Sequence, residues 1–190
     1  PGGVVLEFES GSLSEPIDLG FEVEFFGRRY SQVQVGHNGY VSLGTQGKAF
    51  VAGFWSDFVE AGSSGVLSYR IVGQAPTRVF VARWDQVEVD LILPSVVTYE
   101  IVFSEQVRGV TVNCERCTHG EIPSIFPARQ GALAHGGQFF CPEGRCGSNN
   151  WSAIRESILV ETSVLGGDGI GDACDLCPDQ LDAGSDTDAD

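Results

Sequence analysis

The sequence of 190 residues has little basic charge, a single lysine and no long apolar run. Against 11 Lys and Arg stand 26 Asp and Glu, so the formal net charge is −15. Such an acidic surface repels phosphate, which excludes nucleic acid and anionic lipid as electrostatic partners. No apolar run reaches the ~18 residues that a membrane-spanning helix needs, so we expect no transmembrane segment.

A sustained helical period is also missing from the chain. Between Val4 and Val112, short runs of Val, Phe, Ile and Tyr alternate with polar residues and are separated by Gly, Ser, Asn and Pro, which is typical of strands and turns. We predict strands near Val4–Phe8, Phe21–Phe26, Gln32–Val35, Tyr40–Leu43, Gly65–Ile71, Arg78–Trp84, Val96–Phe103 and Gly109–Val112. This pattern favours a sandwich or a barrel, and we expect an all-β fold built as a β-sandwich.

Local signals refine this prediction at three places. Asn38-Gly39 tolerates positive φ at two successive positions, which predicts a tight hairpin between the flanking apolar runs. Pro94 is expected to end the run Val89–Leu93. Ser152–Ile158 is compatible with one or two helical turns, and the alternative is a last strand over Ser157–Val160.

No cysteine occurs before residue 114, and the even number that follows is concentrated in the second half. The six are Cys114, Cys117, Cys141, Cys146, Cys174 and Cys177. In an acidic, lysine-poor chain they indicate disulfides formed in an oxidising compartment, so we expect a secreted or cell-surface protein.

Residues 113–150 are rich in Gly, Cys, Pro, Arg and His and show little periodicity. We expect a cysteine-rich irregular insertion ordered by disulfides, because a structureless loop of this length is unusual. Cys141 is a candidate partner of Cys146, with Cys114 and Cys117 paired locally or across the insertion. The alternative is a zinc or copper site formed by these four cysteines with His119 and His135.

From residue 168 to the end, the chain contains eight Asp and no Lys or Arg. Asp168, Asp172 and Asp175 take positions 5, 9 and 12 of a calcium loop when Gly169 takes the turn at position 6. Asp186, Asp188 and Asp190 then take positions 1, 3 and 5 of a second loop. Carboxylates at these spacings predict Ca²⁺ as the bound cation. The alternative is a solvated acidic linker, because the first loop lacks two expected carboxylates.

The segment from Asp168 to Pro178 keeps Asp, Gly and Cys in the register of thrombospondin type 3 repeats, which residues 166–190 resemble. The resemblance implies a calcium-lined extracellular stalk stitched by disulfides, with Cys174 and Cys177 among the cysteines. It also implies further repeats after Asp190.

Five segments of the first half follow one another in a recognisable order: Leu19–Tyr30, Val33–Gly44, Gly53–Phe58, Gly65–Arg70 and Val79–Asp85. With the Asn38-Gly39-Tyr40 hairpin and the Trp55-Ser56-Asp57 segment, residues 17–112 resemble the nidogen-type extracellular (NIDO) domain. The resemblance implies an all-β extracellular module of adhesion and matrix proteins without established catalysis. The cysteine-rich insertion after Val112 departs from the family pattern.

The tryptophans and acids of these segments also have an interpretation of their own. Trp55 and Trp84 follow apolar strand residues, so we expect both to anchor the core. Asp57 and Asp85 are expected at strand ends, where their carboxylates accept backbone N–H bonds. The alternative is that Asp57, Glu60 and Asp85 meet to hold a further cation.

We therefore expect a NIDO-like sandwich over residues 1–163, including the 113–150 insertion, followed by a calcium-binding tail over residues 164–190. No nucleophile elbow, zinc-binding helix or phosphate loop accompanies the three histidines, so we expect a non-enzymatic adhesion or recognition module. Its ligand would be an extracellular protein or glycan. The alternatives are a self-assembling subunit of a surface layer or filament, and a zinc- or copper-binding protein.

Overall fold

The computed structural model describes residues 3–7, 11–45, 47–56, 58, 65–89, 95–118, 129–133, 139–140 and 152–160. These residues contain strands and no helix: β1 (Val4–Val5), β2 (Ile17–Phe25), β3 (Arg28–Gly36), β4 (Tyr40–Leu43), β5 (Phe50–Trp55), β6 (Val66–Val72), β7 (Val79–Val89), β8 (Ser95–Ser104), β9 (Val110–Thr118), β10 (Arg129–Leu133), β11 (Phe139–Phe140) and β12 (Ser152–Val160). The all-β prediction is confirmed. No helix long and apolar enough to cross a membrane occurs in the part of the chain that the structure describes.

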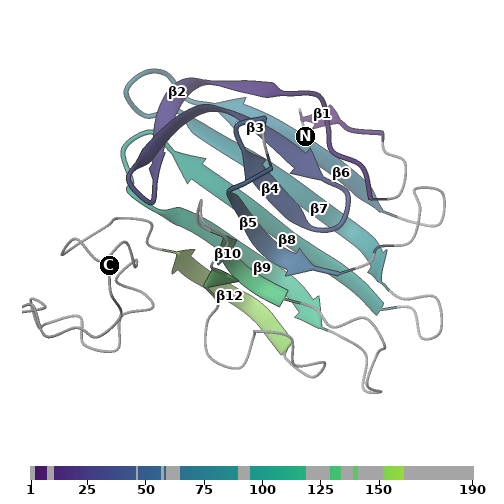
Figure 1. Ribbon diagram of the computed structural model, residues 1–190. Helices are drawn as coiled ribbons and strands as arrows, with labels where there is room; N and C mark the ends of the chain where they lie inside the picture. Colours follow the sequence, from purple (N-terminus) through teal and green to yellow (C-terminus); the bar gives the residue numbers. More distant parts are fainter. Residues whose placement is uncertain are drawn as a thin grey trace, which may run out of the picture.

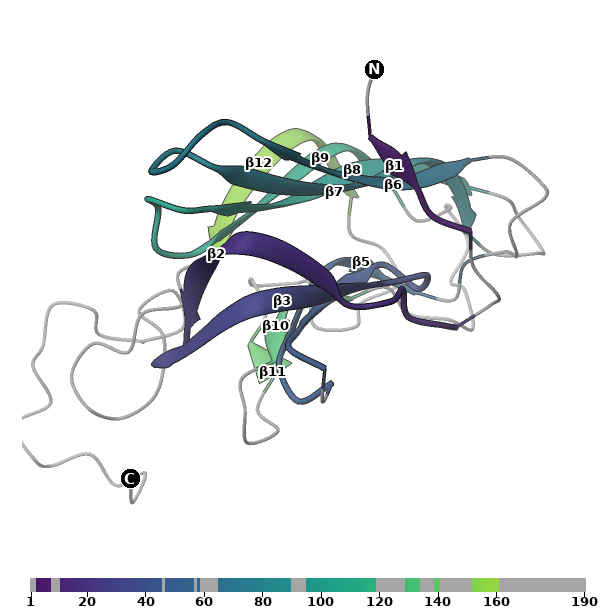
Figure 2. The ribbon, with the colours of Figure 1, turned by 90° about the horizontal axis from the view of Figure 1, so that it is seen from above.

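The strands form two antiparallel six-stranded sheets (Figure 1). The β7 sheet has the order β1-β6-β7-β8-β9-β12, and the β4 sheet has the order β11-β10-β5-β4-β3-β2. Seen from above, the two sheets lie as two layers, one over the other (Figure 2). The expected sandwich-like arrangement of two layers is therefore present.

The core lies between the two sheets because alternate residues of each strand are apolar. In β2, buried and exposed positions alternate from Ile17 to Phe25. The largest fully buried side chains come from both sheets and include Phe25, Phe54, Phe80, Trp84, Tyr99 and Phe103. Burying a side chain of this size stabilises the fold by about 1.5–3 kcal/mol, so this aromatic layer is a large part of what joins the sheets.

The eight predicted strands correspond to β1–β4 and β6–β9, whereas β5, β10 and β11 were not predicted. The last-strand interpretation of residues 157–160 is confirmed and extends back to Ser152, and the helical alternative is wrong. β12 forms because it pairs along β9, which supplies the hydrogen bonds that a helix would supply internally. Residues 113–150, which we expected to be irregular, contain β10, β11 and the last residues of β9.

A β-bulge in β9 interrupts the alternating pattern by which a strand is recognised in a sequence. Thr98 of β8 pairs with Arg116, but the next residue of β8, Tyr99, pairs with Cys114, so Glu115 is an extra residue. On the other side of β9, Arg155 lies opposite Glu115 and has a φ of 53°. The extra residue breaks the two-residue period, which turns both cysteines of β9 toward the core.

The predicted hairpin at Asn38-Gly39 is confirmed as the β3–β4 connection. Gly36 pairs with Tyr40, so three residues rather than two form the turn, and Gly39 donates its N–H to the Gly36 carbonyl at 3.2 Å. The positive φ within the turn, 93°, belongs to Gly39 and not to Asn38. The turn thus needs one left-handed residue, and glycine supplies it.

This turn rests on a stacked pair of aromatic rings from the opposite sheet. The rings of Trp84 in β7 and Tyr99 in β8 lie 4.8 Å apart and nearly parallel, and both side chains are fully buried. The Trp84 indole N–H donates to the His37 carbonyl at 3.4 Å. A Cβ on Gly39 would overlap the Phe54 carbonyl oxygen, and one on Gly53 would overlap the Tyr99 ring. The sheets approach this closely only because both positions are glycine.

Replacing Gly39 with alanine should therefore destabilise the protein strongly. We expect the Gly39→Ala variant to lose about 3 kcal/mol of unfolding free energy, from left-handed strain and overpacking combined. Urea denaturation followed by tryptophan fluorescence measures the loss. Gly47 is the matched control, because its φ is 63° but a Cβ there would meet nothing within 4 Å. Equal losses in Gly39→Ala and Gly47→Ala would contradict the close approach.

Candidate functional site

The predicted calcium ligands Asp168, Asp172, Asp175, Asp186, Asp188 and Asp190 lie outside the described residues, and so do Cys141, Cys146, Cys174, Cys177, His119, His135, Asp57 and Glu60. Their roles stay predictions. Within the described ranges, no group of three or more His, Cys, Asp or Glu side chains is placed to hold a metal ion.

The two tryptophans of the NIDO-like segments have different positions. Trp84 is fully buried, as predicted. Trp55 is only half-buried, so its assignment to the core is wrong. Its ring instead joins a cluster with Tyr40 and Phe50, at centroid distances of 6.2 Å and 5.2 Å. The hairpin and the Trp55 segment also meet through the backbone, because Ser56 N–H donates to the Asn38 carbonyl at 3.3 Å.

Asp85 lies within β7 rather than at its end, so the strand-end prediction is wrong for this residue. Its carboxylate accepts a hydrogen bond at 3.2 Å from Arg83, whose guanidinium also donates to Glu100 and Glu115 at 3.1 Å each. This ladder of opposite charges crosses β7, β8 and β9. The Arg83–Asp85 pair lies within β7, whereas the pairs of Arg83 with Glu100 and Glu115 join neighbouring strands. The alternative that Asp85 shares a cation with Asp57 and Glu60 stays a prediction.

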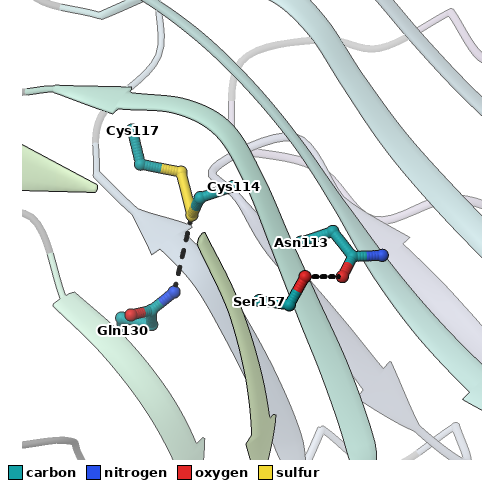
Figure 3. The surroundings of a disulfide bond; sticks show 5 residues. All are labelled: Asn113, Cys114, Cys117, Gln130 and Ser157. Atoms are coloured by element: carbon teal, nitrogen blue, oxygen red, sulfur yellow. Dashed lines mark hydrogen bonds between the residues drawn. A yellow bond between two sulfur atoms is a disulfide. The ribbon is translucent and has the colours of Figure 1, made fainter. Parts of the chain in front are cut away.

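A disulfide joins Cys114 and Cys117 within β9, with their Cα atoms 5.6 Å apart (Figure 3). Local pairing is thus what the structure shows for these two cysteines. Both are buried, and the amide of Gln130 donates to the sulfur of Cys114 at 3.7 Å. Gln130 belongs to β10 in the β4 sheet and is fully buried, so the bond lies between the two sheets. Its two sulfurs offer no free thiolate to zinc or copper.

Beside the disulfide, β12 is fastened to β9 by side chains as well as by backbone. Ser157 donates its hydroxyl hydrogen to Asn113 Oδ1 at 2.8 Å, and the two residues pair directly across the strands (Figure 3).

Arg78, just before β7, clamps the other end of the sandwich. Its guanidinium donates to Glu105 through two nitrogens, Nε at 2.9 Å and Nη2 at 2.6 Å. Its third nitrogen, Nη1, donates to the Gly20 carbonyl, and its guanidinium carbon lies 5.7 Å from the Phe21 ring centroid. Gly20 and Phe21 belong to β2 in the β4 sheet, whereas Glu105 follows β8 in the β7 sheet. The Arg78 guanidinium thus binds both sheets. We call this set of contacts the Arg78 clamp.

The clamp changes the chemistry of Glu105. Hydrogen bonds from the Arg78 side chain lower the pKa of the Glu105 carboxyl to about 2, from an ordinary value of 4.5. Partial desolvation opposes this change but is the smaller effect. Glu105 therefore stays ionised under almost all conditions, and its charge is committed to Arg78.

Next to the clamp, a cavity of about 260 Å³ opens between the two sheets. We call it the charged cavity; it is lined by Glu22, Val23, Glu24, Arg29, Ser104, Glu105, Gln106, Val107 and Arg108. β2 and β3 form one wall and the β8–β9 turn forms the other. Glu22 and Arg29 form an ion pair at 3.4 Å, with exposed side-chain fractions of 62% and 70%.

Sequence reasoning did not find this cavity or its clamp. Arg78 lies 58 residues from Gly20 and 27 from Glu105, so no local spacing relates them. The sequence signal is limited to charged residues at the ends of predicted strands, which is the usual pattern of a solvated turn.

A family model described as NIDO related matches residues 2–125 of the chain. The match includes β1–β9 and therefore the stacked Trp84 and Tyr99, the Arg78 clamp and the charged cavity. No curated protein and no solved structure matches the chain.

Removing the disulfide should weaken the join between β9 and β10. For the Cys114→Ala/Cys117→Ala double variant, we expect a loss of about 2 kcal/mol in unfolding free energy, as the chain-entropy model gives for a short closed loop. Urea denaturation without reductant measures the loss. The same comparison with reductant is the control, because the difference between wild type and variant should then shrink. A difference that reductant leaves unchanged would show that the bond does not form.

The Arg78–Glu105 pair should make the free energy of unfolding depend on pH in the acidic range. Since the folded pKa of Glu105 is lowered, its contribution is fully present above pH ~4.5 and is lost as the pH falls toward 2. We expect Glu105→Gln to be less stable than wild type at pH 7, with the difference closing between pH 5 and about 2. Urea midpoints at several pH values measure this. Glu22→Gln, at an exposed ion pair, should show little such effect, and a constant Glu105→Gln difference at all pH values would refute the clamp.

Proposed function

Because the chain belongs to the NIDO-related family, we propose that it is a non-enzymatic extracellular or cell-surface recognition module, joined to a calcium-binding tail. The family match over residues 2–125 is the observation that carries this proposal. The recognised ligand would be an extracellular protein or glycan, and the protein would act by binding.

The disulfide and the acidity of the chain support an extracellular location. Structural disulfides persist in oxidising compartments, and the Cys114–Cys117 bond is a buried structural one. The pairing of the other four cysteines stays a prediction, and the extracellular proposal requires that they too are oxidised.

The proposed calcium sites use the Asp residues of the tail. Asp168, Asp172 and Asp175 would share one cation, and Asp186, Asp188 and Asp190 would begin the next site. Without a cation these carboxylates repel one another, because no Lys or Arg occurs among them. Calcium would neutralise the repulsion and stiffen the tail into a stalk that carries the sandwich.

Calcium removal should affect the tail and leave the sandwich folded. We expect chelation to leave the far-UV sheet spectrum and the tryptophan fluorescence unchanged, since none of the proposed ligands lies in β1–β12. Native mass spectrometry without reductant should show bound calcium and fully oxidised cysteines. Asp172→Asn/Asp175→Asn should lose calcium, whereas Asp18→Asn in β2 should retain it.

Two results would refute the proposed function. Loss of sheet structure on chelation would mean that calcium holds the sandwich itself. Free thiols with tightly bound zinc or copper would favour the metal-binding alternative instead.

One observation favours self-assembly as a second candidate function. In the described residues β12 has a strand neighbour on one side only, and its Ile154 and Leu159 are 66% and 44% exposed. A long edge strand with apolar side chains is able to pair with a strand of another copy. Concentration-dependent sedimentation that Ile154→Lys abolishes would support assembly, and a monomer at all concentrations would refute it.

A further inference from the structure

We propose that the β7 sheet joins copies of this chain edge to edge, with β12 of one copy pairing antiparallel beside β1 of the next. Copies joined in this way form an open filament and not a closed dimer. The proposal deepens the self-assembly candidate and rests on it, because it names the surface that receives β12. The recognition role and calcium binding do not enter it.

Exposed apolar side chains gather at the two edges of the β7 sheet. Of the nine large apolar side chains that are exposed in the described residues, seven belong to β1, β6 and β12. Those seven are Val4, Val5, Val66, Ile71, Val72, Ile154 and Leu159. β12 forms one edge of the sheet, whereas β1 and β6 are the outermost strands at the other edge (Figure 1). Both edges thus expose side chains that a strand of another copy would cover.

The β2 edge of the other sheet has a different character. β2 is the last strand of the β4 sheet, and its positions on the solvent side include Asp18, Glu22 and Glu24. A row of charges of one sign along an edge strand opposes pairing with another chain. β1 carries no charged residue, and β12 carries one of each sign. The protection that β2 has is therefore missing from both edges of the β7 sheet.

β1 presents backbone groups that a further strand would pair. Leu6, next to β1, donates its N–H to the Leu67 carbonyl of β6 at 2.9 Å. Because the backbone groups of successive residues in a strand point to opposite sides, the N–H and carbonyl of Val5 point away from β6. Within the described residues, no strand lies beyond β1. β12 of another copy would supply the partners, as in β-strand addition.

The strand directions allow this pairing to repeat without end. All neighbouring strands of the β7 sheet are antiparallel. Because the sheet has six strands, β1 and β12 run in opposite directions. When a second copy stands beside the first in the same orientation, its β1 is therefore antiparallel to β12 of the first. Each copy then uses two different edges, so the contact is heterologous and leaves a free edge at either end of the assembly.

The exposed charges of the two edges are complementary. Glu7 lies two residues after β1, Arg155 lies in β12, and both side chains are exposed. Among the described residues, neither side chain has a group of opposite charge within ion-pairing distance. Pairing of the two edges would bring this carboxylate and this guanidinium together across the strands.

The register that joins these charges also matches the faces of the two strands. With Glu7 opposite Arg155, antiparallel pairing sets Val4 opposite Ile158. In its own sheet Val4 lies opposite Tyr69, which, like Ile158, packs on the core. Val4 and Ile158 thus belong to the core-side face of the sheet. The joined sheets would continue with the same faces on the same side, as strand register requires.

A closed dimer through two β12 strands accounts for less of what the structure shows. It would cover the β12 edge and leave Val4 and Val5, which are 53% and 61% exposed, uncovered at the other edge. Glu7 would take no part in such a dimer. The role of Glu7 therefore separates the filament from the dimer.

Sedimentation velocity of the full chain over a wide concentration range tests for open assembly. We expect the weight-average mass of the wild type to rise past that of a dimer. Arg155→Glu and Glu7→Lys should each weaken association by about three- to tenfold, because reversing a charge replaces an attraction across the strands by a repulsion. Glu7→Lys is the sharper of the two, since it also lowers the net negative charge, which alone would ease association. Arg28→Glu, at an exposed position of β3 in the other sheet, is the matched control and should associate as the wild type does.

Mixing the two variants tests the pairing of the edges directly. The β12 edge of the Arg155→Glu variant then meets the β1 edge of the Glu7→Lys variant with opposite charges, and so do the two edges that are unchanged. We expect the equimolar mixture to recover most of the wild-type association, although each variant alone is weakened. The far-UV sheet spectrum shows that each variant is folded.

Three results would overturn the proposal: a mass that stops at the dimer, a Glu7→Lys variant that associates as the wild type does, or a mixture no better than its components. Each of them leaves another form of self-assembly standing. A monomer at all concentrations would overturn this proposal and the self-assembly candidate together. None of these results alters the calcium and disulfide measurements, so the proposed recognition function is tested separately.

Discussion

The stack of Trp84 on Tyr99 is the contact on which the rest of the structure depends. It belongs to the β7 sheet, yet the β4 sheet reaches it at Gly39 and Gly53, where any side chain would collide with its surroundings. The Asn-Gly-Tyr hairpin and the segment that carries Trp84 look like separate motifs in the sequence, but they meet at this place. The hairpin lies over the stacked rings, accepts a hydrogen bond from the Trp84 indole and contacts the Trp55 segment through its backbone. These residues are therefore explained by packing between layers, and they need no ligand.

Two further connections join the sheets away from this centre. Near one edge, the disulfide of β9 receives a hydrogen bond from Gln130 of the opposite sheet. At one end, Arg78 binds the β2 backbone and the carboxylate of Glu105 together. The second connection ties β2 to the β8–β9 turn, the two segments on opposite sides of the charged cavity.

The charge of the protein is divided unevenly along the chain. The described residues contain ten of the 11 basic side chains but only 11 of the 26 acidic ones, so the sandwich is close to neutral. The excess of acid lies elsewhere, above all in the eight Asp of the last 23 residues. This division agrees with the two roles that we propose. The nearly neutral sandwich is the proposed recognition module, whereas the acidic tail provides carboxylates to calcium.

The sequence by itself determined the fold class, most of the strands, the β3–β4 hairpin and the burial of Trp84, because alternation and turn residues are local signals. It could not determine β5, β10 or the end of β9, because a bulge or a glycine breaks the alternation there. Trp55 and Asp85 were placed wrongly for a related reason: which face a strand residue occupies depends on the register with its neighbours. The Cys114–Cys117 pairing, the Arg78 clamp and the charged cavity were decided only by the tertiary structure, since each joins residues or faces that only the pairing and stacking of strands bring together.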